Sequence, residues 1–350
     1  MKVGTFIDQG WLDAIPEATR HAEEMGYDFV CCDESSHDSM LKMTLAASAS
    51  QRVKLLTAIT VAFPRSPMVL AMEAWDIQHL SRGRFILGLG TSSKQHNERR
   101  FGVAWTPPAP RMKEYVRCLH AIWETFQHSR KPDFVGKTYR FQYIEGYNPG
   151  PIPYPRPRVF LGVVGDAMAR VAGEVADGIP YTFLPDRYMR EVILPNVKIG
   201  LERAGRTWED IEIIGPGAVI FGENESEIEQ RLGRVRSRIV AGFGATASYR
   251  KIFELHGWGD LGERLYALSL EGGKWEEMRR VIPEAVLRDF VQTSTGDNLP
   301  DFIRQHREYT KGIVIGLPAR TPAERERLQH LIKEIQKVQT PGVPAGLGSP

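Results

Sequence analysis

Three ionisable side chains fall within five residues of one another: Glu34, His37 and Asp38. They follow residues 28–32, a short apolar run typical of a buried strand. A histidine titrates near neutral pH and carboxylates accept or hold protons, so this group could perform general acid–base chemistry. A solvated loop could have the same composition. We predict Glu34, His37 and Asp38 as catalytic candidates, with His37 first.

A second candidate is the run Gly162-Val163-Val164-Gly165-Asp166, which precedes a predicted helix over 167–176. The free N–H groups and the positive dipole at the start of such a helix attract phosphate. Asp166 is expected only to cap the helix. An unliganded strand-to-helix turn would use the same glycines, and both interpretations stay open.

A third candidate is the stretch from Ser81 to Thr91, with the sequence Ser-Arg-Gly-Arg-Phe-Ile-Leu-Gly-Leu-Gly-Thr. It combines a helix end, a two-residue turn and an apolar strand without alternation, which indicates a strand covered on both faces. Gly88 and Gly90 leave room for something flat, although glycine at a strand end also permits a simple turn.

Other side chains have weaker signals. The basic loop residues Lys94, Arg99 and Arg100, with His96 among them, could be solvated or hold an anionic tail. Phe63 and Trp105 could wall a flat ring or belong to the core. A metal site is not predicted, because His37 and Asp38 have no second histidine at the local spacing that zinc favours. The sequence has no Gly-x-Ser-x-Gly nucleophile motif.

Strands and helices alternate along the chain. The predicted strands are 2–7, 28–32, 53–61, 84–90, 158–161, 177–179, 211–221 and 312–317. Each is followed by an amphipathic segment with apolar residues at three- and four-residue spacing. Strict alternation indicates parallel strands with right-handed crossovers, either an open doubly wound sheet or a closed barrel. Eight units favour an α/β fold of the (β/α)8 TIM-barrel type.

The barrel accounts for most of the 350 residues. We predict one domain over 1–340, with a surface crossing over 130–157 and the largest insertion, 246–299, between helix seven and strand eight. The Pro/Gly-rich tail, 341–350, is expected to be disordered. In a TIM barrel the site lies at the carboxyl ends of the strands, which places candidates at 8–9, 33–38, 61–65, 90–100, 162–166, 180–183 and 221–223.

Composition excludes several classes of function. The 45 basic and 43 acidic residues are scattered and give a net charge of +2, so no basic stripe indicates nucleic-acid binding. No signal-peptide core and no apolar run of membrane-spanning length is present, and we expect a cytoplasmic protein without membrane contact. Cys31, Cys32 and Cys118 fit neither a zinc site nor a disulfide framework and are expected to be buried thiols.

Several motifs together resemble the bacterial luciferase-like superfamily. They are Asp33 after the second strand, residues 56–60 leading to Arg65-Ser66-Pro67, the stretch 81–91, and Ala172-Gly173-Glu174-Val175-Ala176-Asp177-Gly178. The resemblance covers nearly the whole barrel in the order of the family. Arg65-Ser66-Pro67, Ala74-Trp75-Asp76 and the loop 96–102 look most like the branch of oxidoreductases that depend on the deazaflavin coenzyme F420.

The resemblance implies a cofactor ring across the barrel mouth, against a bulge in strand three that contains a non-prolyl cis peptide, here Ala58–Ile59. It also implies that Gly90 and Thr91 allow the ring or its ribityl chain to approach and that the backbone of Val164 and Gly165 holds a phosphate. The implied cofactor-binding set is therefore Asp33, Ala58, Ile59, Thr60, Gly90, Thr91, Val164 and Gly165.

Two positions differ from the sugar-phosphate dehydrogenases of the family. Glu34 follows Asp33 where those enzymes have histidine, and Ser92-Ser93 follows Thr91 where they have an acidic residue. We therefore do not expect glucose-6-phosphate oxidation.

The resemblance implies hydride transfer between F420 and a small organic substrate, with His37 or Glu34 handling the proton. An alternative is an FMN-dependent monooxygenase supplied by a separate reductase, and a further one is a non-catalytic cofactor-binding protein. The resemblance also suggests a homodimer formed through barrel helices.

Overall fold

The computed structural model describes residues 1–7, 10–180, 183–215, 218–222, 224–239, 246–272, 274–295, 298–306, 308–316, 319, 321–344 and 346–347. Its centre is a parallel sheet. The barrel strands are β1 (Lys2–Phe6), β2 (Phe29–Cys32), β3 (Lys54–Thr57), β5 (Phe85–Gly90), β8 (Arg158–Leu161), β9 (Gly178–Ile179), β10 (Glu212–Ile213) and β13 (Gly312–Val314). The short strand β4 (Thr60–Val61) continues β3 and pairs with β5.

The sheet closes on itself. The strand order is β10-β9-β8-β5-β3-β2-β1-β13, with Lys2 opposite Gly312 where β1 meets β13. A bridge between Ile214 and Gly312 joins the two ends, with the Lys311 N–H donating to the Ile213 carbonyl at 2.9 Å. The predicted TIM barrel is confirmed.

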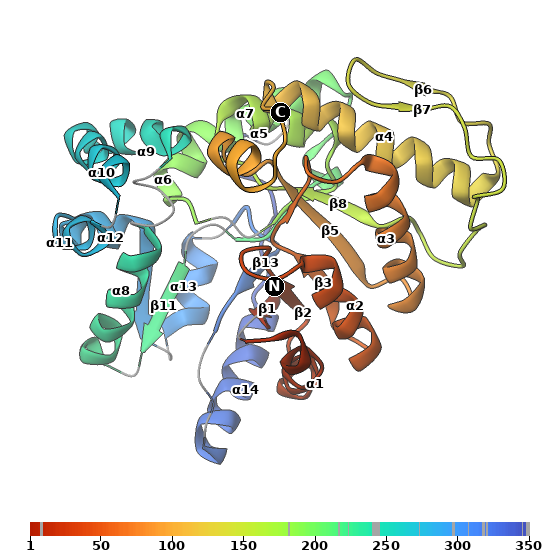
Figure 1. The fold of residues 1–350 in the computed structure, drawn as a ribbon. Helices are drawn as coiled ribbons and strands as arrows, with labels where there is room; N and C mark the ends of the chain where they lie inside the picture. The colour runs from red at the N-terminus through yellow and green to blue at the C-terminus, as the bar shows by residue number, and fades with distance from the viewer. Residues whose placement is uncertain are drawn as a thin grey trace.

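Helices surround the strands as an outer ring (Figure 1). They are α1 (Ile15–Met25), α2 (Ser39–Ala49), α3 (Pro67–Leu80), α4 (Pro108–His128), α5 (Asp166–Val175), α7 (Leu194–Arg203) and α14 (Pro322–Lys337). Their ends follow the local sequence. Gly26 ends α1 with φ 93°, a left-handed conformation that glycine adopts without strain. Thr321 and Glu324 form a capping box at the start of α14.

The barrel interior is filled in layers. An inner apolar cluster consists of Phe29, Cys31, Leu56, Ile86, Phe160 and Ile214. At the amino ends of the strands, the buried carboxylate of Glu212 lies 2.6 Å from both Lys2 Nζ and Arg158 Nη1. These two ion pairs tie β10 to β1 and β8 at the end opposite the expected site. The three cysteines are buried thiols, as predicted.

The predicted seventh strand is wrong as a single element. Of 211–221, only β10 belongs to the barrel, whereas β11 (Ala218–Gly222) pairs in parallel with β12 (Val291–Thr295) in a separate two-stranded sheet. The sequence between β10 and β11 contains Pro216, and proline has no N–H to continue a ladder.

The outer sheet and its helices lie to one side of the barrel (Figure 1). The helices are α8 (Glu225–Ile239), α9 (Arg250–Leu255), α10 (Gly259–Glu271), α11 (Trp275–Arg280), α12 (Glu284–Phe290) and α13 (Leu299–His306), with a 3-10 turn at Ala247–Tyr249. The elements outside the barrel thus begin before residue 246, where we predicted the insertion to start. The single-domain assignment stays a prediction.

One other predicted strand is divided: residues 53–61 form β3 and β4 on either side of a bulge. Residues 186–204 form α6 (Asp186–Tyr188), a π-turn (Met189–Ile193) and α7. The crossing over 130–157 contains the hairpin β6 (Phe134–Val135) and β7 (Arg140–Phe141).

Part of the tail contacts the barrel: the Leu347 carbonyl accepts a 3.0 Å bond from Trp208 Nε1. Disorder in the tail stays a prediction. No described helix is long and apolar enough to cross a bilayer.

Candidate functional site

Most of the predicted site residues lie where the barrel strands end, but Phe221 and Gly222 of the candidate segment 221–223 belong to β11, outside the barrel, so this part of the prediction is wrong. Asp8, Gln9, Tyr181, Thr182 and Glu223, which belong to the candidate segments 8–9, 180–183 and 221–223, fall outside the described residues. Apart from Pro180 and Phe183, which follow β9, the remaining candidates at the barrel mouth come from the loops after β2, β3, β5 and β8, which are neighbours in the barrel order. Four adjacent strand ends therefore supply most of the described part of the site.

The floor of the site is built around a cis peptide. The bond between Ala58 and Ile59 is cis, as the resemblance implied. The Ala58 N–H donates to the Cys32 carbonyl at 2.7 Å. A Cβ added to Gly90 would lie 2.5 Å from Ile59 Cδ1, and one added to Gly162 would lie 3.4 Å from Ile59 Cγ2. The Ile59 side chain thus lies against two glycines at the ends of neighbouring strands, and we call these residues and Ala58 the floor of the site.

Glu34 and Asp38 are joined by Arg65. Both carboxylates bind Arg65 Nη2, and Arg65 Nη1 also donates to Glu34 Oε2 at 3.0 Å. The side chain of Glu34 is 8% exposed, and its Oε2 accepts the Val61 N–H at 2.5 Å. Asp38 is also the N-cap of α2 and accepts from the Met40 N–H at 2.8 Å. Both oxygens of Glu34 are engaged, so it is held as an anchor in this conformation.

A third carboxylate adjoins the same guanidinium. Glu73 Oε2 lies 3.9 Å from Arg65 Nε and is buried without a hydrogen-bond partner among the described residues. Burial outweighs the nearby charge of Arg65 and raises the pKa of Glu73. Burial would lower the pKa of Arg65, but its bonds to Glu34 and Asp38 outweigh that effect and raise it.

His37 is placed differently from the two carboxylates. Its ring packs on Trp11 from the loop after β1, with ring centroids 4.8 Å apart. Trp11 is 73% exposed, so this pair stands at the protein surface near the ends of β1 and β2. Of the three catalytic candidates, His37 is the one whose polar atoms are not engaged by Arg65.

Asp33 and Thr60 fix the backbone beside the floor. Asp33 Oδ1 accepts from Ser35 Oγ at 2.8 Å, and its carbonyl accepts from the buried Lys42 Nζ at 3.0 Å. Thr60 Oγ1 lies 2.8 Å from Ser39 Oγ at the start of α2. Both residues connect strand ends to α2.

The loop after β5 is held by a buried amide. Asn97 Nδ2 donates to the carbonyls of Thr91 and Ser93 at 2.8 and 2.9 Å. Thr91 Oγ1 donates to the Ser92 carbonyl at 3.1 Å, and Ser92 has φ 55°. Arg100 Nη2 reaches the Ser35 carbonyl at 2.5 Å and so connects this loop to the one after β2.

The loop after β8 leads into α5. Gly165 is the N-cap of α5 and makes no side-chain cap, and a Cβ added there would meet no atom within 4 Å. The Val164 carbonyl accepts from Tyr188 OH at 3.0 Å, which orients the loop. Lys251 Nζ of α9 lies 2.7 Å from Asp166 Oδ2. This bond lowers the pKa of Asp166 and brings the insertion to the start of α5.

Aromatic residues connect the insertion to the barrel. Phe183, after β9, stacks on Phe290 of α12 at 6.3 Å, and Phe253 of α9 lies 6.1 Å from the same ring. Phe63 and Trp105, the predicted ring walls, pack edge to face at 6.4 Å. Phe63 is buried and has the Arg111 guanidinium over its ring at 4.2 Å.

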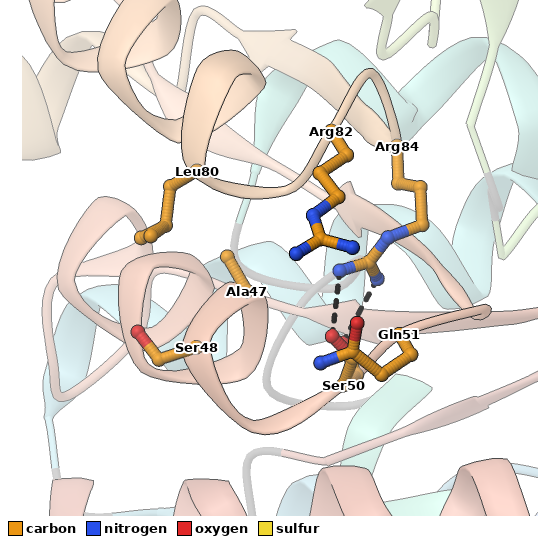
Figure 2. Close-up of a pocket in the computed structure, with 7 residues that line it drawn as sticks. All are labelled: Ala47, Ser48, Ser50, Gln51, Leu80, Arg82 and Arg84. Atoms are coloured by element: carbon orange, nitrogen blue, oxygen red, sulfur yellow. Dashed lines mark hydrogen bonds between the residues drawn. The ribbon is translucent and has the colours of Figure 1, made fainter.

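A pocket of about 190 Å³ lies at the opposite end of the barrel, before β3 and β5. Figure 2 shows Arg82 and Arg84 beside Ser50 in this pocket. Arg84 donates to Ser50 Oγ at 2.9 Å and to the Val53 carbonyl at 2.6 Å. In the stretch 81–91, the arginine end therefore fixes the fold, and only the glycine end belongs to the candidate site.

Sequence reasoning missed Lys42, Asn97, Tyr188 and Lys251, and it did not identify Arg65 as a partner of Glu34. A charged residue inside the apolar run of α2 was an available signal for Lys42, since a buried lysine requires a partner. The contact of Lys251 depends on the path of the insertion and has no local signal.

The arrangement fits a planar cofactor with a phosphate-bearing arm. Ala58, Ile59, Gly90 and Gly162 are small or apolar residues, and the open space at Gly165 lies before the first turn of α5, whose N-cap residue provides no side-chain cap. No group of three or more potential metal ligands is found within the described ranges.

Comparisons with known proteins identify the family of the chain. The family model described as luciferase-like monooxygenase matches residues 2–311. An uncharacterized protein of Mycobacterium tuberculosis is 40% identical over 288 residues, covering 82% of this chain and 84% of its own. The 5,10-methylenetetrahydromethanopterin reductase of Archaeoglobus fulgidus is 25% identical, covering 90% and 92% of the two chains.

A solved structure gives the same fold. The coenzyme F420-dependent tetrahydromethanopterin reductase of Methanopyrus kandleri superposes with a TM-score of 0.75 at 18% identity, covering 97% of this chain and 99% of that one. At this identity the likeness concerns the fold alone, whereas the family model spans nearly the whole barrel. The chain belongs to the luciferase-like monooxygenase family.

Proposed function

We propose that this protein is an F420-dependent oxidoreductase that transfers hydride between the deazaflavin and a small organic substrate. The observation that carries the proposal is the glycine floor at the cis Ala58–Ile59 bulge, followed along the barrel by the uncapped start of α5. Support comes from curated relatives, among them the A. fulgidus reductase and a putative coenzyme F420-dependent oxidoreductase of M. tuberculosis that is 27% identical over 83% of this chain.

In this proposal the residues of the chain bind and orient the cofactor. Ile59, Gly90 and Gly162 support the ring, Thr91 faces its side arm, and the N–H groups that begin α5 hold the phosphate. When bound, a deazaflavin supplies two-electron hydride chemistry, because carbon replaces the ring nitrogen that flavins use with oxygen. His37 holds or releases the proton, since both oxygens of Glu34 are bonded to Arg65 and Val61.

The test is a paired titration of the purified protein with F420 and with FMN, followed by the fluorescence of each cofactor. Tighter binding of F420 supports the proposal, and binding of neither contradicts it. His37→Ala should then abolish turnover in a screen of alcohols and ketones while cofactor binding stays intact. The matched control is His128→Ala on the far end of α4, where the side chain is 52% exposed.

An FMN-dependent monooxygenase supplied by a separate reductase is the second candidate. The description of the matching family favours it, and the EDTA monooxygenase of Chelativorans sp. shares the fold with a TM-score of 0.68 at 15% identity. A clear preference for FMN in the same titration would replace the first candidate with this one. Cofactor binding without turnover of any substrate by the wild type would instead favour a non-catalytic binding protein.

Assembly and location complete the proposal. We propose a cytoplasmic homodimer, and the surface of α2 and α3 is the face we assign to the second copy. The exposed apolar side chains Leu41, Val69, Met72 and Leu80 lie on these two neighbouring helices. Covering them would remove apolar area from water.

A further inference from the structure

We propose that Arg65 and Glu34 act as a clasp that positions the cofactor floor, so that Glu34 and Arg65 are positioning residues and not proton donors. The inference rests on the proposed cofactor site and concerns the segment that follows the cis peptide. It assigns a role to an ion pair that links three parts of the barrel mouth: the end of β2, the start of α2 and β4.

The clasp holds both backbone groups of one residue. Glu34 Oε2 accepts the Val61 N–H at 2.5 Å, and Arg65 Nη1 donates to the Val61 carbonyl at 3.2 Å. Val61 lies two residues after Ile59 and is paired with Gly90 across β4 and β5. Any displacement of Val61 therefore moves Ile59 relative to the glycines that it covers.

The guanidinium is itself fixed from several sides. Its Nη2 binds both Glu34 and Asp38, and Asp38 is held as the N-cap of α2 by the N–H groups of Met40 and Leu41 at 2.8 and 3.0 Å. The Arg65 side chain is 14% exposed. A planar fork with several donors can bridge two carboxylates and a carbonyl at once, which a lysine ammonium on its flexible stem does not reproduce.

The backbone of Arg65 is held as well. Its carbonyl accepts from Tyr115 OH of α4 at 3.1 Å, and its N–H donates to the Ala62 carbonyl at 3.0 Å. The residue is thus anchored at both its backbone and its guanidinium. The cofactor ring would contact Ile59 and the glycines, while the clasp fixes the position of Ile59 relative to these glycines.

The first experiment compares Arg65→Lys with Arg156→Lys. Arg156 makes a bidentate pair with Asp177 at 2.7 and 2.9 Å at the other end of the barrel, so both variants lose a fork of the same kind. We expect Arg65→Lys to weaken F420 binding about tenfold, whereas Arg156→Lys changes the dissociation constant less than about twofold. Thermal melting of both variants identifies a temperature at which both are folded, and the dissociation constants are measured at that temperature.

Binding of the deazaflavin chromophore without its phosphate arm distinguishes a defect at the ring site from a defect at the phosphate site. A defect in the floor predicts the same loss for F420 and for the bare deazaflavin, whereas a defect at α5 would spare the bare chromophore. Glu34→Gln retains an acceptor for the Val61 N–H and should lose less affinity than Glu34→Ala. Equal binding by wild type and Arg65→Lys, or an equal loss in Arg156→Lys, would overturn the proposal.

Hydrogen exchange of the backbone N–H groups in the segment 58–65 measures how firmly the bulge is held, and it needs no cofactor. The clasp predicts slow exchange in the wild type and faster exchange in Arg65→Lys and Glu34→Ala. If the wild type binds neither cofactor, the proposed function fails, and the hold on Val61 is still decided by this measurement. Unchanged exchange in both variants would show that Arg65 and Glu34 do not hold the bulge.

Discussion

His120 on α4 makes folding sensitive to acid. Its Nε2 is buried without a hydrogen-bond partner among the described residues. Burial, with the added repulsion of Arg156 and Arg206, lowers the pKa of His120 to about 4, although Asp177 acts in the opposite direction. The unfolded chain then binds a proton near the usual histidine pKa of about 6.5, while the folded chain does not.

The sign follows from this difference. Stability from neutral His120 is complete at neutral pH and declines as the pH falls from about 6.5 toward about 4, because the unfolded state takes up the proton first. At 1.36 kcal/mol per pKa unit, the full effect is about 3 kcal/mol, and about 2 kcal/mol of it appears between roughly pH 7.5 and pH 5. These are upper values, because the residue as a whole is half-buried.

The assay is urea unfolding at several pH values for the wild type, His120→Leu and His128→Leu. The free energy of unfolding of His120→Leu should depend less on pH than that of the wild type by about 2 kcal/mol over this interval. His128→Leu, at an exposed histidine of the same helix, should keep the wild-type slope. If His120→Leu and the wild type have the same slope, the buried neutral histidine is not the cause.

Four further substitutions make separate tests: two concern folding stability, one concerns cofactor binding and one concerns assembly. Gly88→Ala should destabilise the fold by about 2 kcal/mol or more, since its Cβ would lie 1.8 Å from the Thr57 carbonyl oxygen, and urea unfolding measures this. Gly165→Ala places its Cβ in open space and should leave unfolding unchanged while weakening the binding of phosphorylated cofactor relative to the bare chromophore. Glu73→Gln should raise stability near neutral pH and remove the gain that the wild type shows on acidification, because burial raises the pKa of Glu73 and the folded state therefore binds the proton more tightly. Val69→Glu should convert a dimer into a monomer in light scattering after size exclusion, and an unchanged mass would contradict the proposed face.

The barrel could be predicted because its signals are local and repeated. Apolar strands, first-turn prolines and the glycine that ends α1 each reflect a constraint within a few residues, and β8 has the predicted bounds. The seventh strand failed because the apolar run 211–221 has the composition of one long strand. Which sheet β11 joins depends on its pairing with β12, whose residues are far along the chain.

The structure brings several of the predicted site residues together, and their contacts could be predicted less well than their place in the barrel. Glu34, His37 and Asp38 appear equivalent in sequence, and only their surroundings separate them. Arg65 is distant from Glu34 along the chain, and its reach to two carboxylates arises when β2 and β3 lie side by side. The cis Ala58–Ile59 peptide was implied by family resemblance, since nothing in the local residue types requires it.

The closure of the barrel has a consequence for synthesis of the chain. Strand β13 contacts both β1 and the end of β10, yet it comes after every other barrel strand in the sequence. Until residues 312–314 leave the ribosome, the nascent sheet has two unpaired edges, and exposed edges recruit other strands. Such late, long-range pairing is slow and leaves the emerging polypeptide prone to aggregation. Overexpression should therefore depend on chaperones more strongly than the stability of the finished protein would indicate, and stop codons placed before Gly312 should yield inclusion bodies.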